Sequence, residues 1–279
     1  MNLPKPLLKL NRRKKNKQMN ETELLFTKVL NCSRNSLYLH NGAALDREKQ
    51  LFISSVLKRR IKGEPIQYIL GESEFMGLPF KVTRDVLIPR PETEILIETV
   101  LKYGPQKILE LGTGTGCIAV SLAKFIPSVR IVALDISKGA LIVAVENAER
   151  NGVLDKIEFK LFDLLADNGE FHKVQIGNFD LIVSNPPYIR SSQIHGLAPE
   201  IQFEPRVALD GGEDGLDFYR KIIKNASSYL NKNGYLILEM GFGQCAKIRK
   251  ILQNSLNFEI IEVVKDYSNI DRVIVSKNR

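Results

Sequence analysis

Beyond Pro91 the chain alternates short apolar runs with longer amphipathic stretches, and this alternation restricts the possible folds more than any other feature. Short apolar runs are typical of strands buried on both faces, and the stretches between the first five are long enough for helical crossovers. The link between the last two runs is too short to join anything but antiparallel neighbours. We therefore expect an α/β fold with a mostly parallel sheet. Its seven candidate strands are 107–111, 130–135, 157–163, 179–185, 234–240, 258–264 and 272–276.

The residues before Pro91 show a different pattern of apolar residues. From Glu21 to about Ile61 the apolar residues fall at helical spacing, and glycines and prolines then break the pattern. Alternation and glycines over 75–88 suit a hairpin. We divide the 279 residues into four parts. They are a basic tail expected to be disordered (1–18), a helical domain (19–72), a hairpin connector (73–90) and the α/β domain (91–279).

The positive charge of the chain is concentrated in its tail. The formal net charge is +8, but residues 1–18 hold seven Lys and Arg and no acid, so +1 remains for everything that follows. Apart from that tail, we expect no nucleic-acid partner. The simplest interpretation of the tail is a solvated end. Three alternatives are an arm that touches RNA, a segment ahead of a true start at Met19, and a targeting segment.

Several classes of protein are disfavoured by what the sequence lacks. No stretch approaches the roughly 18 apolar residues of a membrane helix, so we expect a cytoplasmic protein. Cys32, Cys117 and Cys245 are odd in number and far apart, which disfavours a disulfide framework. The histidines are scattered without ligand spacing, so we expect no metal site. These are His40, His172 and His195.

A glycine-rich turn follows the first candidate strand. Glycines there let the backbone approach a ligand closely. Dinucleotide-binding folds place glycines at positions 1, 3 and 6, whereas Gly112, Gly114 and Gly116 occupy positions 1, 3 and 5. This acid-x-Gly-x-Gly-x-Gly form, with Glu110 as the acid, resembles the first motif of S-adenosylmethionine enzymes and disfavours a nucleotide-binding oxidoreductase.

Acidic residues close the second and third candidate strands. Asp135 lies roughly 20 residues after the glycines, where a carboxylate can accept hydrogen bonds from ribose hydroxyls. Asp163 is placed to accept from an adenine amino group, with Phe162 or Leu164 near the ring; its alternative is a carboxylate within a turn. The predicted cofactor residues are Glu110, Gly112, Thr113, Gly114, Gly116, Asp135, Ile136, Asp163, Leu164 and Asn185.

The fourth candidate strand runs directly into Asn185, Pro186, Pro187 and Tyr188. Prolines remove N–H donors and extend the residue before them, so acceptors remain. The Asn185 side-chain oxygen and the Pro186 carbonyl can hold both protons of an NH₂ group and aim its lone pair at a methyl carbon. Tyr188 would pack against the planar group. We predict that these four residues are catalytic and contact the substrate, which disfavours a non-catalytic binding module.

In these motifs the chain resembles the release-factor glutamine methyltransferases, the PrmC/HemK family. The resemblance runs from about residue 20 to the end and includes 63–71, 74–78, 88–94 and 204–216. It implies a Rossmann-like S-adenosylmethionine methyltransferase domain behind a small N-terminal helical domain that binds substrate. It also implies that S-adenosyl-L-methionine becomes S-adenosyl-L-homocysteine. The tail before Met19 departs from the family pattern.

The resemblance further implies a substrate, which is the side-chain amide of the glutamine in the Gly-Gly-Gln loop of class 1 peptide-chain release factors. By the same analogy, Arg90 and Glu92 line the cleft near the cofactor or substrate. Alternatively, Arg90 forms a plain salt bridge and Glu92 begins the next helix. Two other substrates share the chemistry: a ribosomal-protein glutamine, or an exocyclic amine of a nucleic-acid base, which would require a basic groove. We expect a monomer.

Overall fold

The computed structural model describes residues 19–39, 45–166 and 177–279. The predicted tail, His40 and His172 lie outside these ranges. Within them, seven strands form one sheet in the order β5-β4-β3-β6-β7-β9-β8. All neighbouring pairs are parallel except those of β9, which runs antiparallel to β7 and to β8. The predicted mostly parallel sheet with an antiparallel hairpin at its end is confirmed.

The bounds of β3 and β4 are as predicted, and those of the other five strands differ from the predicted ones by one to four residues at an end. The strands of the main sheet are β3 (Lys107–Leu111), β4 (Arg130–Asp135), β5 (Ile157–Leu161), β6 (Phe179–Ser184), β7 (Leu230–Glu239), β8 (Phe258–Lys265) and β9 (Asp271–Asn278). The prediction for β7 began too late, because Asn231 to Gly234 look like a turn in sequence although the strand already pairs with β6 at Leu230. Polar residues at a strand end carry no apolar signal, so sequence misses them.

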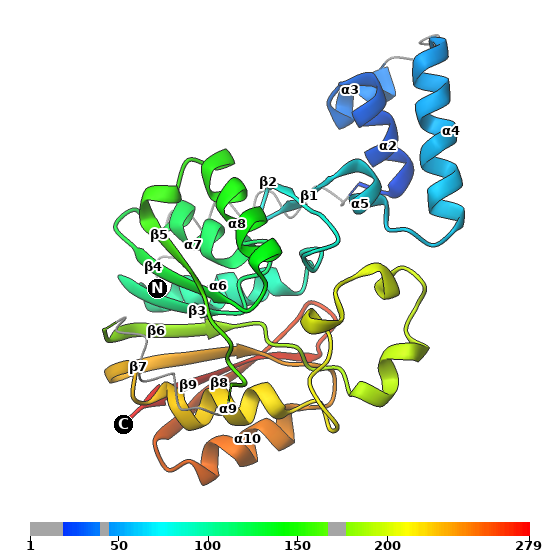
Figure 1. Cartoon of the computed structure of the whole chain (residues 1–279). Helices are drawn as coiled ribbons and strands as arrows, with labels where there is room; N and C mark the ends of the chain where they lie inside the picture. Colours follow the sequence, from blue (N-terminus) through cyan, green and yellow to red (C-terminus); the bar gives the residue numbers. More distant parts are fainter. Residues whose placement is uncertain (1–18, 40–44, 167–176) are drawn as a thin grey trace.

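Helices cover both faces of the sheet (Figure 1). One core cluster joins the sheet to α6 (Thr93–Tyr103), α7 (Cys117–Phe125) and α8 (Lys138–Arg150). A second cluster joins the opposite face to α9 (Asp217–Ala226) and α10 (Cys245–Asn254). The central strands are therefore buried on both sides, which explains their continuous apolar runs.

The N-terminal helices form a separate small unit (Figure 1). They are α2 (Glu21–Leu30), α3 (Arg34–Leu39), α4 (Arg47–Ile61) and α5 (Ile66–Leu70). Their core is small and centres on Leu25, Val56 and Ile66. Asn20 and Glu23 form a capping box that begins α2, which satisfies N–H groups that a helix start leaves without partners.

A short hairpin links this unit to the sheet domain. It consists of β1 (Glu72–Phe75) and β2 (Leu78–Lys81), so it lies earlier than the predicted alternation over 75–88. Asn147 of α8 holds β2 through both of its side-chain groups, accepting from Lys81 N at 2.6 Å and donating to Lys81 O at 3.0 Å. These two hydrogen bonds therefore hold the connector against the sheet domain.

A long connection between β6 and α9 folds over the carboxyl end of the sheet. It contains three 3₁₀ turns, η3 (Ser191–Gly196), η4 (Ile201–Phe203) and η5 (Arg206–Ala208). Its Glu200 pairs with Arg60 of α4 at 3.0 Å, which joins the connection to the N-terminal helices. Long connections at this end of an open α/β sheet are positioned to hold ligands.

Candidate active site

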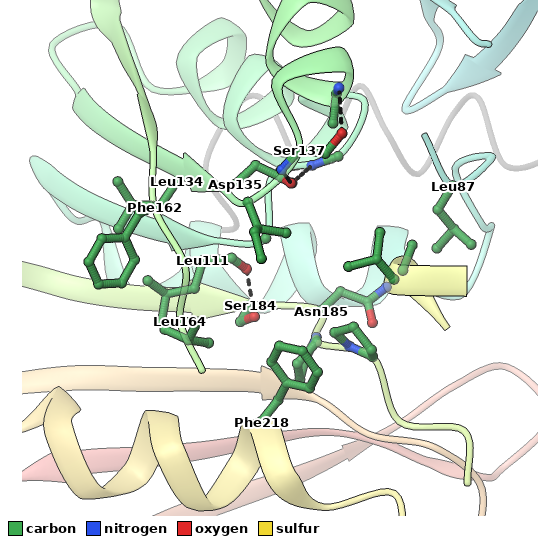
Figure 2. Close-up of a pocket in the computed structure, with 18 of the residues that line it drawn as sticks. Leu87, Leu111, Leu134, Asp135, Ser137, Phe162, Leu164, Ser184, Asn185 and Phe218 are labelled. Carbon is green, nitrogen blue, oxygen red and sulfur yellow. Dashed lines mark hydrogen bonds between the residues drawn. The ribbon is translucent and has the colours of Figure 1, made fainter. Parts of the chain in front are cut away.

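An open cavity lies at the carboxyl ends of β3, β4, β5 and β6 (Figure 2). Its volume of about 920 Å³ includes the solvent at its mouth. Its walls come from the ends of four strands, where open α/β sheets bind their ligands. The cavity brings together seven of the predicted cofactor residues, namely Gly112, Gly114, Asp135, Ile136, Asp163, Leu164 and Asn185.

The glycine turn forms one wall of this cavity. Gly112 and Gly114 have φ angles of +75° and +55°, and a Cβ added to either would meet no protein atom within 4 Å. Because both glycines line the cavity, such a Cβ would project into the space available to a ligand. The turn itself is fixed by Gly112 N and Thr113 N, which both donate to the Leu134 carbonyl at 2.9 Å.

Three of the predicted cofactor residues lie behind this wall. Glu110, Thr113 and Gly116 are not among the residues that line the cavity. Glu110 is fully buried and accepts from Thr113 Oγ1 at 2.8 Å, while its Oε1 has no hydrogen-bond partner in the described part of the chain. Burial raises the pKa of Glu110 to about 8. These residues support the shape of the glycine turn.

Asp135 ends β4 and faces the glycine turn. Its Oδ2 accepts from Gly114 N at 2.8 Å and its Oδ1 from Ser137 N at 2.9 Å. Burial raises the pKa of Asp135, and these backbone N–H groups oppose the rise. Ser137 caps α8 by accepting from Ala140 N. Asp135 therefore has a fixed position, and each oxygen keeps a further lone pair for a ligand hydroxyl.

Asp163 lies two residues after β5 ends, in a turn in which its Oδ1 accepts from Leu165 N at 2.8 Å. Phe162 and Leu164 both turn toward the cavity (Figure 2). Asp163 can therefore stabilise this turn and also accept a hydrogen bond from a cofactor, since its other oxygen is not used by the bond to Leu165 N. Together these residues make an apolar slot edged by a carboxylate.

Asn185 follows the last residue of β6 at the other side of the cavity (Figure 2). Its Nδ2 donates to Thr93 Oγ1 at 3.1 Å, at the start of α6. Within 19–39, 45–166 and 177–279, no donor hydrogen-bonds to Asn185 Oδ1 or to the Pro186 carbonyl. Ser184 is fixed beside them by donating to the Leu111 carbonyl at 2.7 Å. The two predicted acceptors are therefore available for an external donor.

Tyr188 is held at the edge of the second core cluster and does not line the cavity. Gln244 Nε2 donates to the Tyr188 carbonyl at 3.0 Å. The glycine-rich run 211–216 packs directly on this stretch, and a Cβ on Gly211 would lie 2.7 Å from the Pro187 carbonyl oxygen. Only glycine permits this approach, so the run supports the backbone that presents Asn185 and Pro186.

Arg90 and Glu92 also lie outside the cavity lining. Arg90 Nη2 pairs with Glu204 Oε2 at 2.6 Å, and the Glu204 side chain is only 1% exposed. Burial raises the pKa of Glu204, opposed by Arg90. Glu92 is the exposed N-cap of α6 without a side-chain capping bond. The geometry therefore favours the salt-bridge and helix-start alternatives for these two residues.

Two polar residues that surround Asn185 were not predicted from sequence. Thr93 holds Asn185, and Glu239, at the end of β7, lies beside both of them. Glu239 ends an apolar strand in the same way as Asp135, and that pattern could have identified it. Thr93 lies within the run from Pro89 to Glu94, whose charged residues carry the stronger sequence signal.

Among the residues that the structure describes, no group of three or more His, Cys, Asp or Glu side chains could hold a metal ion. No helix in the same residues is both long and apolar enough to cross a bilayer.

The comparisons with known proteins agree with this geometry. Family models match in two places, the PrmC N-terminal domain over residues 8–71 and the methyltransferase small domain over 91–202. The release factor glutamine methyltransferase of Geobacter sulfurreducens is 43% identical over 91% of this chain and 87% of its own length. That of Thermodesulfovibrio yellowstonii is 42% identical over 91% of each chain.

A solved structure shares the fold at low sequence identity. A methyltransferase from Pyrococcus furiosus has a TM-score of 0.56 and 20% identity, covering 80% of this chain and 98% of that one. The Rossmann-like methyltransferase fold is thus confirmed, and the relatives above meet this chain over nearly its whole length. The chain belongs to the release factor glutamine methyltransferase family.

Proposed function

We propose that this chain transfers a methyl group from S-adenosyl-L-methionine to the side-chain amide nitrogen of the glutamine in the Gly-Gly-Gln loop of class 1 release factors. One observation carries the proposal. Asn185 presents its oxygen to the cavity because its Nδ2 is bound to Thr93, and the Pro186 carbonyl next to it accepts no hydrogen bond from the described residues. Two acceptors side by side suit an NH₂ group with two protons to donate.

The cofactor half of the cavity suits S-adenosyl-L-methionine. When bound, this cofactor supplies an electrophilic methyl group on a positively charged sulfur. The open space over Gly112 and Gly114 admits a ligand close to the backbone. We assign Asp135 and the adjacent Ile136 to the ribose side, and Asp163 to the adenine amino group. Phe162 and Leu164 supply the apolar surface on which a planar ring packs.

The substrate half of the cavity suits an amide nitrogen. An amide nitrogen is a poor nucleophile because its lone pair is delocalised. Hydrogen bonds from its two protons to Asn185 Oδ1 and the Pro186 carbonyl would orient it, and orientation can replace intrinsic reactivity. The same oxygens stabilise the positive charge that develops on the nitrogen. The apolar side chains of Leu87, Val207 and Phe218 line the cavity and reduce the access of water, which strengthens these interactions.

The N-terminal helices have a surface that suits a protein substrate. Large apolar side chains on α4 are exposed, a common property of binding surfaces. They are Leu51, Phe52, Leu57 and Ile61. We propose that residues 19–72 bind the release factor away from its glutamine. A translation factor as substrate places the reaction in the cytoplasm. We propose that the chain acts as a monomer.

Transfer of a labelled methyl group from S-adenosyl-L-methionine to a purified class 1 release factor tests this function. We expect label on the wild-type factor and none on a factor whose loop glutamine is replaced by alanine. Equal labelling of both factors would contradict the proposed target. Parallel reactions with ribosomal proteins and with RNA test the two alternative substrates, and labelling of either one in place of the release factor would reassign the chemistry.

A further inference from the structure

Glu239 is a buried carboxyl group beside the proposed substrate half of the cavity. In the parallel register of β6 and β7, Leu238 lies opposite Ser184, so Glu239 and Asn185 are the next residues along their strands. Glu239 is only 1% exposed. Its Oε2 has no hydrogen-bond partner among the described residues. A buried carboxyl group with an unpartnered oxygen is costly, so its retention at this position calls for an explanation.

The hydrogen-bonding neighbours of Glu239 are the two side chains that orient the substrate acceptor. Burial raises the pKa of Glu239 to about 7, and hydrogen bonding to Thr93 and to Asn185 opposes the rise. The charged form is further favoured by Arg272 of β9 and disfavoured by Glu92 at the start of α6. The other titratable groups that sense its charge are Tyr188, Tyr219 and Cys117.

The direction of the hydrogen bonds determines which end of the Asn185 amide faces the cavity. Asn185 Nδ2 donates to Thr93 Oγ1, so this oxygen acts as an acceptor in that bond. The single hydroxyl proton of Thr93 then remains to be donated, and a carboxylate at Glu239 can accept it. With Glu239 ionised, a chain of donors would therefore run from Asn185 through Thr93 to Glu239.

Protonation of Glu239 would allow this chain to reverse. A carboxylic acid can donate to Thr93 Oγ1, which leaves the threonine proton free to point at Asn185. Only the amide oxygen of Asn185 can accept it, which requires the amide to flip. The flipped amide would present NH₂ to the NH₂ of a substrate glutamine, and two donors facing one another cannot form a hydrogen bond.

We propose that Glu239 is a positioning residue whose carboxylate, acting through Thr93, keeps the Asn185 amide oxygen turned toward the substrate nitrogen. The proposal rests on the function proposed above for Asn185. Glu239 itself does not line the cavity, so it acts on the substrate through its neighbours. The charged form of Glu239 is the active one, and methyl transfer should weaken as the pH falls through its pKa.

The rate of methyl transfer to the release factor, measured from pH 5.5 to 9, tests this coupling. For wild type we expect kcat to fall about tenfold per pH unit below the pKa of Glu239. E239Q should lower kcat by at least about tenfold, because its amide can stabilise either orientation of Asn185, and its rate should not vary with pH over the acid range. KM for the release factor should change little in this variant.

Variants of Thr93 test the same chain without altering the carboxyl group. T93V removes the hydroxyl at nearly constant volume and should abolish the acid-side fall in rate, whereas T93S should restore it. E259Q removes an exposed carboxylate from β8 and serves as the matched control, expected to follow wild type. An acid-side fall that persists in both E239Q and T93V would overturn the proposal.

A spectroscopic measurement separates this proposal from the proposed function. In enzyme labelled with ¹⁵N-asparagine, the side-chain NH₂ resonance of Asn185, assigned by its loss in N185A, should move with pH in wild type and stay fixed in E239Q. A resonance that titrates alike in both proteins contradicts the role of Glu239, whether or not the release factor is a substrate. Thermal unfolding of each variant verifies that it is folded. If E239Q is unfolded, the same measurements on T93V test the proposal.

Discussion

The cofactor half and the substrate half of the cavity are built in different ways. The cofactor half depends mostly on backbone groups, because Gly112 and Gly114 leave open space and Gly114 N holds Asp135. The substrate half depends on side chains from three separate elements, with Asn185 after β6, Thr93 on α6 and Glu239 on β7. Cofactor binding should therefore be sensitive to changes in the shape of the cavity, and methyl transfer to changes in the hydrogen bonds around Asn185.

Replacing Asn185 by alanine should have the largest effect and should affect only the rate. Loss of one positioned oxygen at a site of developing charge lowers kcat by roughly 100- to 1,000-fold. Binding of S-adenosyl-L-homocysteine, measured by calorimetry, should remain within about threefold of wild type, since the cofactor half is untouched. N254A, at an exposed position on α10, is the control. A large loss of cofactor affinity in N185A would erase the proposed difference between the halves.

Replacing Gly114 by alanine should have the opposite signature, with cofactor affinity lost first. The new Cβ projects into the cavity, and we expect the Kd for S-adenosyl-L-homocysteine to rise at least about tenfold. Gly104→Ala is a matched control, because Gly104 has a φ of +58°, similar open space around it and no place in the cavity lining. Both variants carry a backbone strain of about 1–2 kcal/mol in the free energy of unfolding. Equal cofactor affinity in the two variants would show that Gly114 does not shape the cofactor site.

Removing Arg90 should affect the connection that covers the cavity more than the chemistry. R90A leaves the buried Glu204 carboxylate without its partner, and we expect the free energy of unfolding to fall by about 1–3 kcal/mol. The lower end of this energy range allows for the partial exposure of the Arg90 side chain. In R90A/E204Q the loss should be smaller, because no unpaired charge remains. Urea unfolding measures the free energy of unfolding of R90A and of R90A/E204Q. A double variant less stable than R90A would contradict the pairing of Arg90 with Glu204.

The smallest effect should come from the surface of α4. L57D changes a half-exposed side chain in the N-terminal unit and should raise KM for the release factor about three- to tenfold, with kcat nearly unchanged. I142D places the same charge on an exposed position of α8 and should leave KM as in wild type. Equal KM values for the two variants would remove the N-terminal helices from substrate binding.

The difference between the halves also explains what could be predicted from sequence. Gly112, Gly114 and Asp135 lie within one strand–turn–helix–strand unit, so a local pattern identifies them. Asn185 was found because a strand leads straight into two prolines. Thr93 and Glu239 meet Asn185 only when the sheet has formed, and no local pattern links them. The pairing of Arg90 with Glu204 also depends on a long connection whose path sequence does not determine.

The orientation of the glutamine amide in the bound complex tests the central claim most directly. A crystal structure of this chain with S-adenosyl-L-homocysteine and a release-factor fragment would measure the distances from the glutamine Nε2 to Asn185 Oδ1 and to the Pro186 carbonyl oxygen. We predict that both lie at about 2.7–3.2 Å, with Asn185 Nδ2 still on Thr93. A glutamine held elsewhere in the cavity, or an Asn185 amide turned with its nitrogen toward the substrate, would contradict the account.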